Sequence, residues 1–248
     1  MHTIFALFVI TSGFITEMSA NYLRDRLPNL HTCPKSRLQA CLPRSLDSMR
    51  PYLAQGVPQL SIPSFEPYYT QFYKMTFENQ YIPMIKFRDT YINSISNFTI
   101  SRVRVVEDHY IEFLARFPFV GVSTKFNAYV SYTSPTLIKS SRYRLNSNFT
   151  NVVAEIIIRG RHFEDEEQYF YVNNVTVAIL KFEGMKTNKQ QRGTPENVTQ
   201  LANDYLALEW DPLTYEIIYN IKNIAAELIQ TIWNRIYTNF PTVMLTSR

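Results

Sequence analysis

The residues near the start of the chain that could do chemistry are its only two cysteines, Cys33 and Cys41, in the stretch CPKSRLQAC. Two thiols at this spacing can help to bind a metal, take part in redox chemistry or form a disulfide. A zinc site would need two further ligands. The four histidines, which offer no paired metal-binding spacing, are His2, His31, His109 and His162. We therefore expect no metal site, and the use of the thiols depends on the compartment that the chain enters.

Residues 1–20 have the pattern of a secretory signal peptide. Ile4–Ile15 is an almost unbroken apolar run, and Met18-Ser19-Ala20 ends in small residues typical of a cleavage site. The run is shorter than the ~20 apolar residues that span a bilayer, and no later segment is apolar enough for a span. We expect cleavage near Ala20 and a secreted, extracellular protein with a Cys33–Cys41 disulfide. An uncleaved anchor is the alternative, because the basic segment before the run is reduced to one histidine.

Glycosylation motifs agree with passage through the secretory pathway. Four Asn-x-Ser/Thr sequons occur, at Asn97, Asn148, Asn174 and Asn197. One or two sequons are expected by chance in a chain of this length, so four of them favour a glycoprotein.

The proposed disulfide constrains the first helix. Residues eight apart on one helix are ~12 Å apart along its axis, whereas the Cα atoms of a disulfide lie within ~7 Å of each other. Cys33 and Cys41 therefore cannot share one straight helix. Apolar residues recur at helical spacing after them, at Leu42, Leu46, Met49 and Leu53. We expect Cys33 to precede a helix that starts at Cys41, and Pro51 and Gly56 to break it.

Residues 68–182 are rich in β-branched and aromatic residues and predict an antiparallel sheet. In one strand Val122, Phe126, Ala128, Val130 and Tyr132 share an apolar face, and Ser123, Lys125, Asn127 and Ser131 share the other, which we expect to be wet. Residues 152–160 and 167–182 predict a hairpin. The acidic run 164–167 near its turn lacks the spacing of a calcium loop, so we interpret it as a solvated hairpin end rather than a cation site. The polar residues 185–199 predict a surface loop.

The C-terminal region predicts one long helix. Beyond Pro212, isoleucines, leucines and aromatic residues follow three- and four-residue steps as far as Phe240, without glycine or proline. This gives about 28 residues, or ~42 Å. The apolar stripe is wider than a surface helix requires, so the helix needs a concave sheet around it.

These elements, in this order, resemble the insect haemolymph juvenile hormone binding and takeout proteins. The residues that stand where the family pattern places them are Cys33, Cys41, Gly56, Pro58, Ile62, Pro63, Pro67, Trp210 and Pro241. The chain departs from the pattern at Ala207, where the family usually has Asn, and at TLIKSSRYRLN, where it has a glycine-rich stretch. The resemblance implies an α+β fold in one domain, residues 21–248: a long C-terminal helix wrapped by a strongly curved antiparallel sheet, with a short N-terminal helix. It also implies an apolar cavity for an isoprenoid or fatty-acid-like ligand.

Catalysis finds no support in sequence motifs, because G-x-S-x-G, H-E-x-x-H and G-x-G-x-x-G are all absent. We expect no enzyme and no cofactor, although motifs do not test an active site assembled from distant residues. The net charge is +4 and the basic residues are scattered, which argues against a nucleic-acid partner. The sequence predicts no oligomeric state.

A carrier of a small hydrophobic ligand is the function that we expect. The candidate lining residues are Val122, Phe126, Ala128, Val130 and Tyr132 on the apolar strand face and Ile221, Leu228 and Trp233 on the helix. The Tyr132 hydroxyl could bond a ligand oxygen. For each residue plain core packing is the competing interpretation, because a solid core and a hollow one give the same periodicity. Two alternatives remain: a secreted interaction protein with a filled core, and a lipid binder that acts at a membrane surface, which we do not expect.

Overall fold

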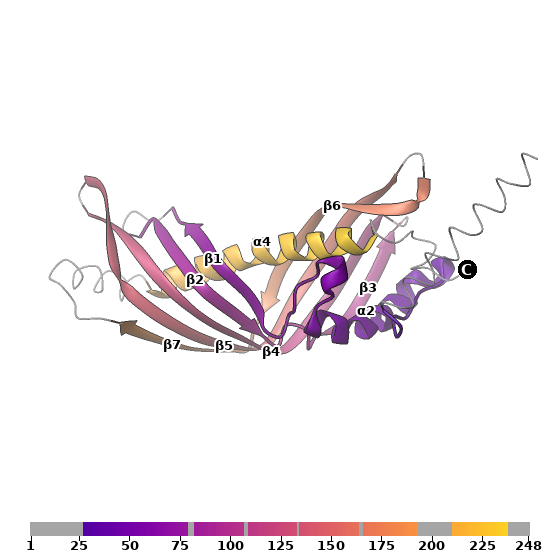
Figure 1. Cartoon of the computed structure of the whole chain (residues 1–248), viewed down its shortest axis with the longest axis horizontal. Helices are drawn as coiled ribbons and strands as arrows, with labels where there is room; N and C mark the ends of the chain where they lie inside the picture. Colours follow the sequence, from indigo (N-terminus) through magenta and orange to yellow (C-terminus); the bar gives the residue numbers. More distant parts are fainter. Residues whose placement is uncertain are drawn as a thin grey trace, which may run out of the picture.

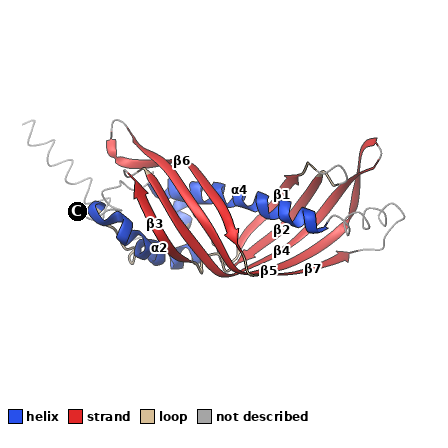
Figure 2. Ribbon diagram, turned by 180° about the vertical axis from the view of Figure 1, so that it is seen from behind, coloured by secondary structure: helices blue, strands red, loops and turns tan. Residues whose placement is uncertain are grey.

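The computed structural model describes residues 27–78, 82–106, 109–132, 134–163, 166–192 and 210–237. The predicted signal peptide and the sequon at Asn197 lie outside these residues. Within them, a large curved antiparallel sheet carries one helix at its end and a second, longer helix across its concave side (Figures 1 and 2). This is the predicted α+β architecture, and the sheet is open rather than closed into a barrel.

The N-terminal region is a short 3-10 turn, η1 (Lys35–Arg37), which leads into helix α2 (Leu38–Gln55) and a second turn, η2 (Pro58–Leu60). The helix begins three residues before the predicted Cys41. The expectation that Pro51 breaks it is wrong: Pro51 is exposed, and Leu53 beyond it is buried, so packing of the last turn outweighs the one hydrogen bond that proline removes. Gly56 ends the helix as predicted. Its φ is 78°, and a Cβ there would lie 2.7 Å from the Ser64 nitrogen.

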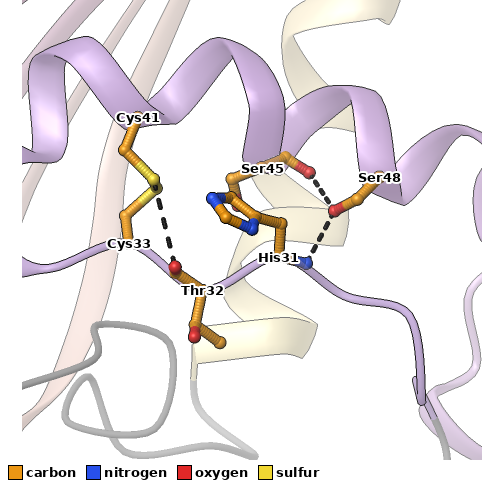
Figure 3. Close-up of a disulfide and its surroundings, with 6 residues drawn as sticks. All are labelled: His31, Thr32, Cys33, Cys41, Ser45 and Ser48. Carbon is orange, nitrogen blue, oxygen red and sulfur yellow. Dashed lines mark hydrogen bonds between the residues drawn. A yellow bond between two sulfur atoms is a disulfide. The ribbon is translucent and has the colours of Figure 1, made fainter.

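The predicted disulfide is confirmed. Cys33 precedes the helix, Cys41 lies in its first turn, and their Cα atoms are 5.6 Å apart (Figure 3). The extended arm before Cys33 is also hydrogen-bonded to α2. The His31 amide donates to Ser48 Oγ at 2.8 Å, and Ser48 Oγ donates to the Ser45 carbonyl at 2.7 Å. The disulfide and these bonds hold the arm along α2 from Cys41 to Ser48.

The sheet has seven described strands. They are β1 (Tyr68–Thr76), β2 (Met84–Asn93), β3 (Thr99–Val106), β4 (Tyr110–Tyr132), β5 (Ser134–Phe163), β6 (Glu166–Lys181) and β7 (Gly184–Arg192). All the pairings are antiparallel. The long strands β4 and β5 run side by side through the whole sheet. The strands β1, β2 and β7 extend the sheet at one end and β3 and β6 at the other.

The strand pairing of β5 confirms one prediction from the sequence and contradicts another. The hairpin predicted from residues 152–160 and 167–182 is confirmed, since β5 pairs with β6. The predicted loop at 185–199 is wrong where the structure describes it, because residues 184–192 form β7 and pair with β5. The side chains of β7 are mostly exposed. Backbone hydrogen bonds to β5 rather than an apolar face hold this strand, and a polar edge strand carries no period-two signal.

The alternation of buried residues changes phase halfway along β4 and β5. At one end of β4 the odd-numbered Ile111, Phe113 and Ala115 are buried, and at the other end the even-numbered Thr124, Phe126 and Ala128. The change falls where β4 has Pro118, which cannot donate a ladder hydrogen bond, and where β5 has Asn151, with a φ of 50°. The irregularity lets both ends of the two strands turn apolar faces toward the same helix.

That helix is α4 (Trp210–Tyr237), which runs across the concave side of the sheet (Figures 1 and 2). Its 28 residues match the predicted length, but it starts at Trp210 rather than beyond Pro212, since proline is tolerated in a first turn. Residues beyond Tyr237 lie outside the described chain. No helix among the described residues is long and apolar enough to cross a membrane.

Candidate functional site

Three apolar clusters hold the helices on the sheet. The first, here the Phe126 cluster, comprises Met75, Phe77, Ile82, Ile85, Phe87, Phe126, Ala128, Tyr143, Leu145 and Leu213. The second, the Trp233 cluster, joins α2, β4, β5 and β6 around Trp233 at the other end of the sheet. The third, the arm cluster, packs Leu27 of the N-terminal arm, the end of α2 and the segment that follows α2 as far as Phe65 against Ile232 and Ile236 of α4. Helix α4 therefore contributes to all three.

The structure distributes the predicted lining residues among these clusters. Phe126 and Ala128 are fully buried in the Phe126 cluster, and Ile221 packs against it. Leu228 packs against the arm cluster, and Trp233 lies in the Trp233 cluster. Val122 is half-buried in β4. The backbones of Val130 and Tyr132 lie in β4, but their side chains fall outside the described part of the chain, so the role predicted for the Tyr132 hydroxyl remains a prediction.

Helix α4 is anchored at both ends and less covered between them. Leu213 near its start is buried, and so are Ile232, Trp233 and Ile236 near its end. Every residue from Tyr215 to Thr231 is half-buried or exposed. The half-buried ones include eight apolar residues: Ile217, Ile218, Ile221, Ile224, Ala225, Ala226, Leu228 and Ile229. The centre of the apolar stripe therefore keeps part of its surface in contact with solvent.

The sheet shows the same pattern at its middle. Val120 and Val122 in β4 and Phe149 in β5 share the parity of Phe126 and Leu145, and so point to the helix side, yet all three are only half-buried. Three half-buried residues of α4 complete what we call the central apolar surface, two of them packed against the Phe126 cluster and one, Leu228, against the arm cluster. The surface comprises Val120, Val122, Phe149, Ile221, Ile224 and Leu228. It lies between the two ends of α4, which are well packed.

Polar bonds fix the C-terminal half of α4 to the sheet. The side-chain amide of Asn234 accepts from the Val172 N–H at 2.7 Å and donates to the Val172 carbonyl at 3.0 Å. Gln230 donates to the same carbonyl at 3.1 Å and to the Asn173 carbonyl at 3.0 Å. Arg235 donates to the carbonyl of Ser61, which directly follows turn η2. These hydrogen bonds fix the C-terminal half of α4 in place.

An aromatic row crosses the Phe126 cluster and ends at a cation. Phe87 lies 5.9 Å from Phe126, and Phe126 stacks on Tyr143 at 4.8 Å. The ammonium of Lys189 in β7 lies 5.8 Å from the centre of the Tyr143 ring. Burial raises the pKa of Tyr143 to about 12 and lowers the pKa of Lys189 from its ordinary value.

Sequence reasoning missed Tyr143 and Lys189 for two reasons. The stretch around Tyr143 was interpreted only as a departure from the family pattern, although Tyr143 and Leu145 alternate with Arg142, Arg144 and Asn146, which is a period-two signal. Lys189 fell in the polar segment that was interpreted as a loop. Its approach to Tyr143 depends on a pairing between residues more than forty positions apart.

The other face of this part of the sheet carries a polar pocket of about 440 Å³. Its lining residues are Asp89, Tyr91, Ser123, Thr124, Lys125, Arg144 and Asn146. Lys125 forms an ion pair with Asp89 at 2.7 Å, and this bond is the main cause of the lowered pKa of the Asp89 carboxyl. Charged groups that neutralise each other in an open, polar setting do not suit an apolar ligand.

The face of β4 that was predicted to be solvent-exposed is not exposed at every position. Asn127 is 2% exposed and accepts a hydrogen bond from the Arg88 guanidinium. Burial is tolerated because the amide is hydrogen-bonded. The three sequon asparagines within the described residues, Asn97, Asn148 and Asn174, are exposed.

Residues 6–247 match the haemolymph juvenile hormone binding protein family. The chain belongs to this family. Among solved structures, takeout 1 of Epiphyas postvittana is similar, with a TM-score of 0.57 at 12% identity over 88% of this chain and 99% of that one. Lipopolysaccharide binding protein matches with a TM-score of 0.40 at 9% identity, over 80% of this chain and 38% of that one. No curated protein sequence matches. The likeness to takeout 1 shows a shared fold for this member of the juvenile hormone binding protein family.

Proposed function

We propose that the protein is a secreted carrier that binds a small hydrophobic ligand, isoprenoid or fatty-acid-like, over the central apolar surface between α4 and the sheet. One observation supports this most strongly: apolar side chains are buried at both ends of α4 but only half-buried along its middle and on the sheet opposite. A plain structural core gives the reverse, with the deepest burial at its centre. Membership of a family named for hormone binding agrees with the proposal.

The hydrophobic effect is large enough to give such a ligand a useful affinity. A ligand that removes roughly 300 Å² of apolar surface from water gains on the order of 7 kcal/mol from the hydrophobic effect. Part of this gain offsets the lost translational and rotational freedom of the ligand. The net affinity therefore depends on how well the ligand fills the space along α4 and on any polar group that fixes its head.

The bonds of α4 suggest how the ligand reaches this surface. The C-terminal half is held by Gln230, Asn234 and Arg235. The N-terminal half rests on the Phe126 cluster through apolar contacts of Leu213, Ile217 and Ile221. Apolar contacts tolerate a small displacement better than directional hydrogen bonds do. We therefore expect the N-terminal half of α4 to move away from the sheet when a ligand enters.

The proposal is tested by native mass spectrometry of the secreted protein, before and after solvent extraction, followed by addition of isoprenoids and fatty acids. A carrier retains or takes up one ligand per chain. Its melting temperature then rises with ligand concentration, because a ligand that binds only the folded state stabilises it by RT ln(1 + [L]/Kd). A clean apo mass, no extractable lipid and no uptake of either class would favour the interaction protein with a filled core.

A further inference from the structure

Strand β7 carries two lysines in different settings. Lys186 pairs with the exposed Asn148 and is itself exposed. Lys189 pairs with Leu145, which is 7% exposed and belongs to the Phe126 cluster. The two positions are three residues apart, an odd step along a strand, so the two side chains leave opposite faces of the strand. Only Lys189 is directed to the apolar, helix side of the sheet.

The surroundings of Lys189 combine a cation, a phenol and an apolar wall. Its ammonium lies 5.8 Å from the centre of the Tyr143 ring, within the range of a cation–π contact. The Tyr143 side chain is 3% exposed and continues through the stacked Phe126 ring into the Phe126 cluster. A tyrosine phenol is protonated at neutral pH and can donate a hydrogen bond, and burial raises the pKa of Tyr143 further, to about 12.

This combination matches the chemistry of a fatty acid. A carboxylate accepts hydrogen bonds from an ammonium and a phenol, and bonds between charged groups are stronger than neutral ones. A half-buried ammonium is costly to desolvate, and a carboxylate beside it offsets that cost. The alkyl chain would then lead from the Phe126 cluster past Ile221 and Ile224 of α4, which pack against that cluster, along the central apolar surface.

We propose that Lys189 and Tyr143 form the head-group site of this carrier and select a long-chain carboxylic acid over neutral esters and alcohols of the same length. The inference rests on the proposed carrier function and adds the class of ligand. The polar end of the ligand would lie at the β5–β7 edge of the Phe126 cluster. Its alkyl chain would lie on the central apolar surface of α4 and the sheet.

The test compares palmitate with methyl palmitate, below their aggregation limits, by titration calorimetry of the secreted protein. We expect palmitate to bind at least tenfold more tightly than the ester. Lys189→Met should abolish this preference while still binding the ester, and the retained ester binding also shows that the variant is folded. Lys189→Arg should keep most of the preference, and Tyr143→Phe should reduce it by a few-fold.

The matched control is Lys186→Met, which removes the same charge from the same strand on its exposed face and should bind both probes as the wild type does. Two results would overturn the head-group site: equal affinity of the wild type for acid and ester, or undiminished palmitate preference in Lys189→Met. In both cases the carrier proposal survives, because the ester still binds. Failure of the wild type to bind either probe contradicts the head-group site and the binding of fatty-acid-like ligands together.

Discussion

The hydrogen bonds between α4 and Val172 of β6 give the most specific stability prediction. Val172 is 0% exposed, and both of its backbone polar groups are bonded to helix side chains: its N–H to Asn234, its carbonyl to Asn234 and Gln230. Replacing Asn234 with Leu leaves the carbonyl bonded to Gln230 but removes the side chain that accepts from the buried N–H. An orphaned buried donor costs ~1–3 kcal/mol, and the second lost bond adds ~1 kcal/mol. We therefore expect Asn234→Leu to lower the free energy of unfolding by about 2–4 kcal/mol.

Urea unfolding followed by circular dichroism measures this change. In a thermal melt, the Tm should fall by roughly 4–16 °C for a chain of this size. Asn223→Leu is the matched control, because Asn223 lies on the exposed face of the same helix, and it should change stability by less than about 0.5 kcal/mol. Hydrogen exchange at the Val172 amide should accelerate in Asn234→Leu. Stability within experimental error of the wild type would show that Asn234 does not fix the helix to the sheet.

Three further changes follow from the geometry. Removing the disulfide in a Cys33→Ser/Cys41→Ser variant should lower the free energy of unfolding by about 2–3 kcal/mol, as expected for a short loop, and chemical denaturation checks this against a wild type kept oxidised; no change would mean that the arm is held by its other contacts. Because burial raises the pKa of Tyr143 to about 12 while an unfolded tyrosine titrates near 10, the unfolded state loses its proton first, and stability should fall by on the order of 1–2 kcal/mol as pH rises from 10 to 12. Tyr143→Phe should lack this decrease and Tyr219→Phe, at an exposed position, should retain it; identical profiles for all three proteins would contradict the burial argument. A Cβ at Gly160 would overlap Phe170 Cζ and lie 2.6 Å from the Tyr171 carbonyl oxygen, so Gly160→Ala should destabilise by ~1–3 kcal/mol, and a thermal melt that matches the wild type would show that β6 moves aside without cost.

Local spacing was sufficient to predict much of the fold. The cysteine pair and the following leucines predicted a disulfide at the start of a helix, and the three- and four-residue steps after Pro212 predicted the length of α4. These features depend on residues close in sequence. The strand β7 was missed because a polar edge strand is held by backbone hydrogen bonds, which leave no hydrophobic pattern.

The candidate site was harder to predict because it depends on long-range register. The apolar alternation of residues 122–132 predicted that Phe126 and Ala128 are buried together. It gave no sign of the phase change at Pro118 and Asn151, which brings both ends of β4 against one helix. Lys189 meets Tyr143 only because β7 pairs with β5, so no local pattern links the two residues.

Photo-crosslinking tests most directly the claim that a ligand lies between α4 and the sheet. A fatty acid with a diazirine at the middle of its chain is bound, irradiated and located by peptide mass mapping. The account predicts labels on residues 217–229 of α4 and 120–128 of β4, reduced by an excess of unlabelled palmitate. Labels that gather around the polar pocket of Asp89 and Arg144, or that excess palmitate does not displace, would contradict it.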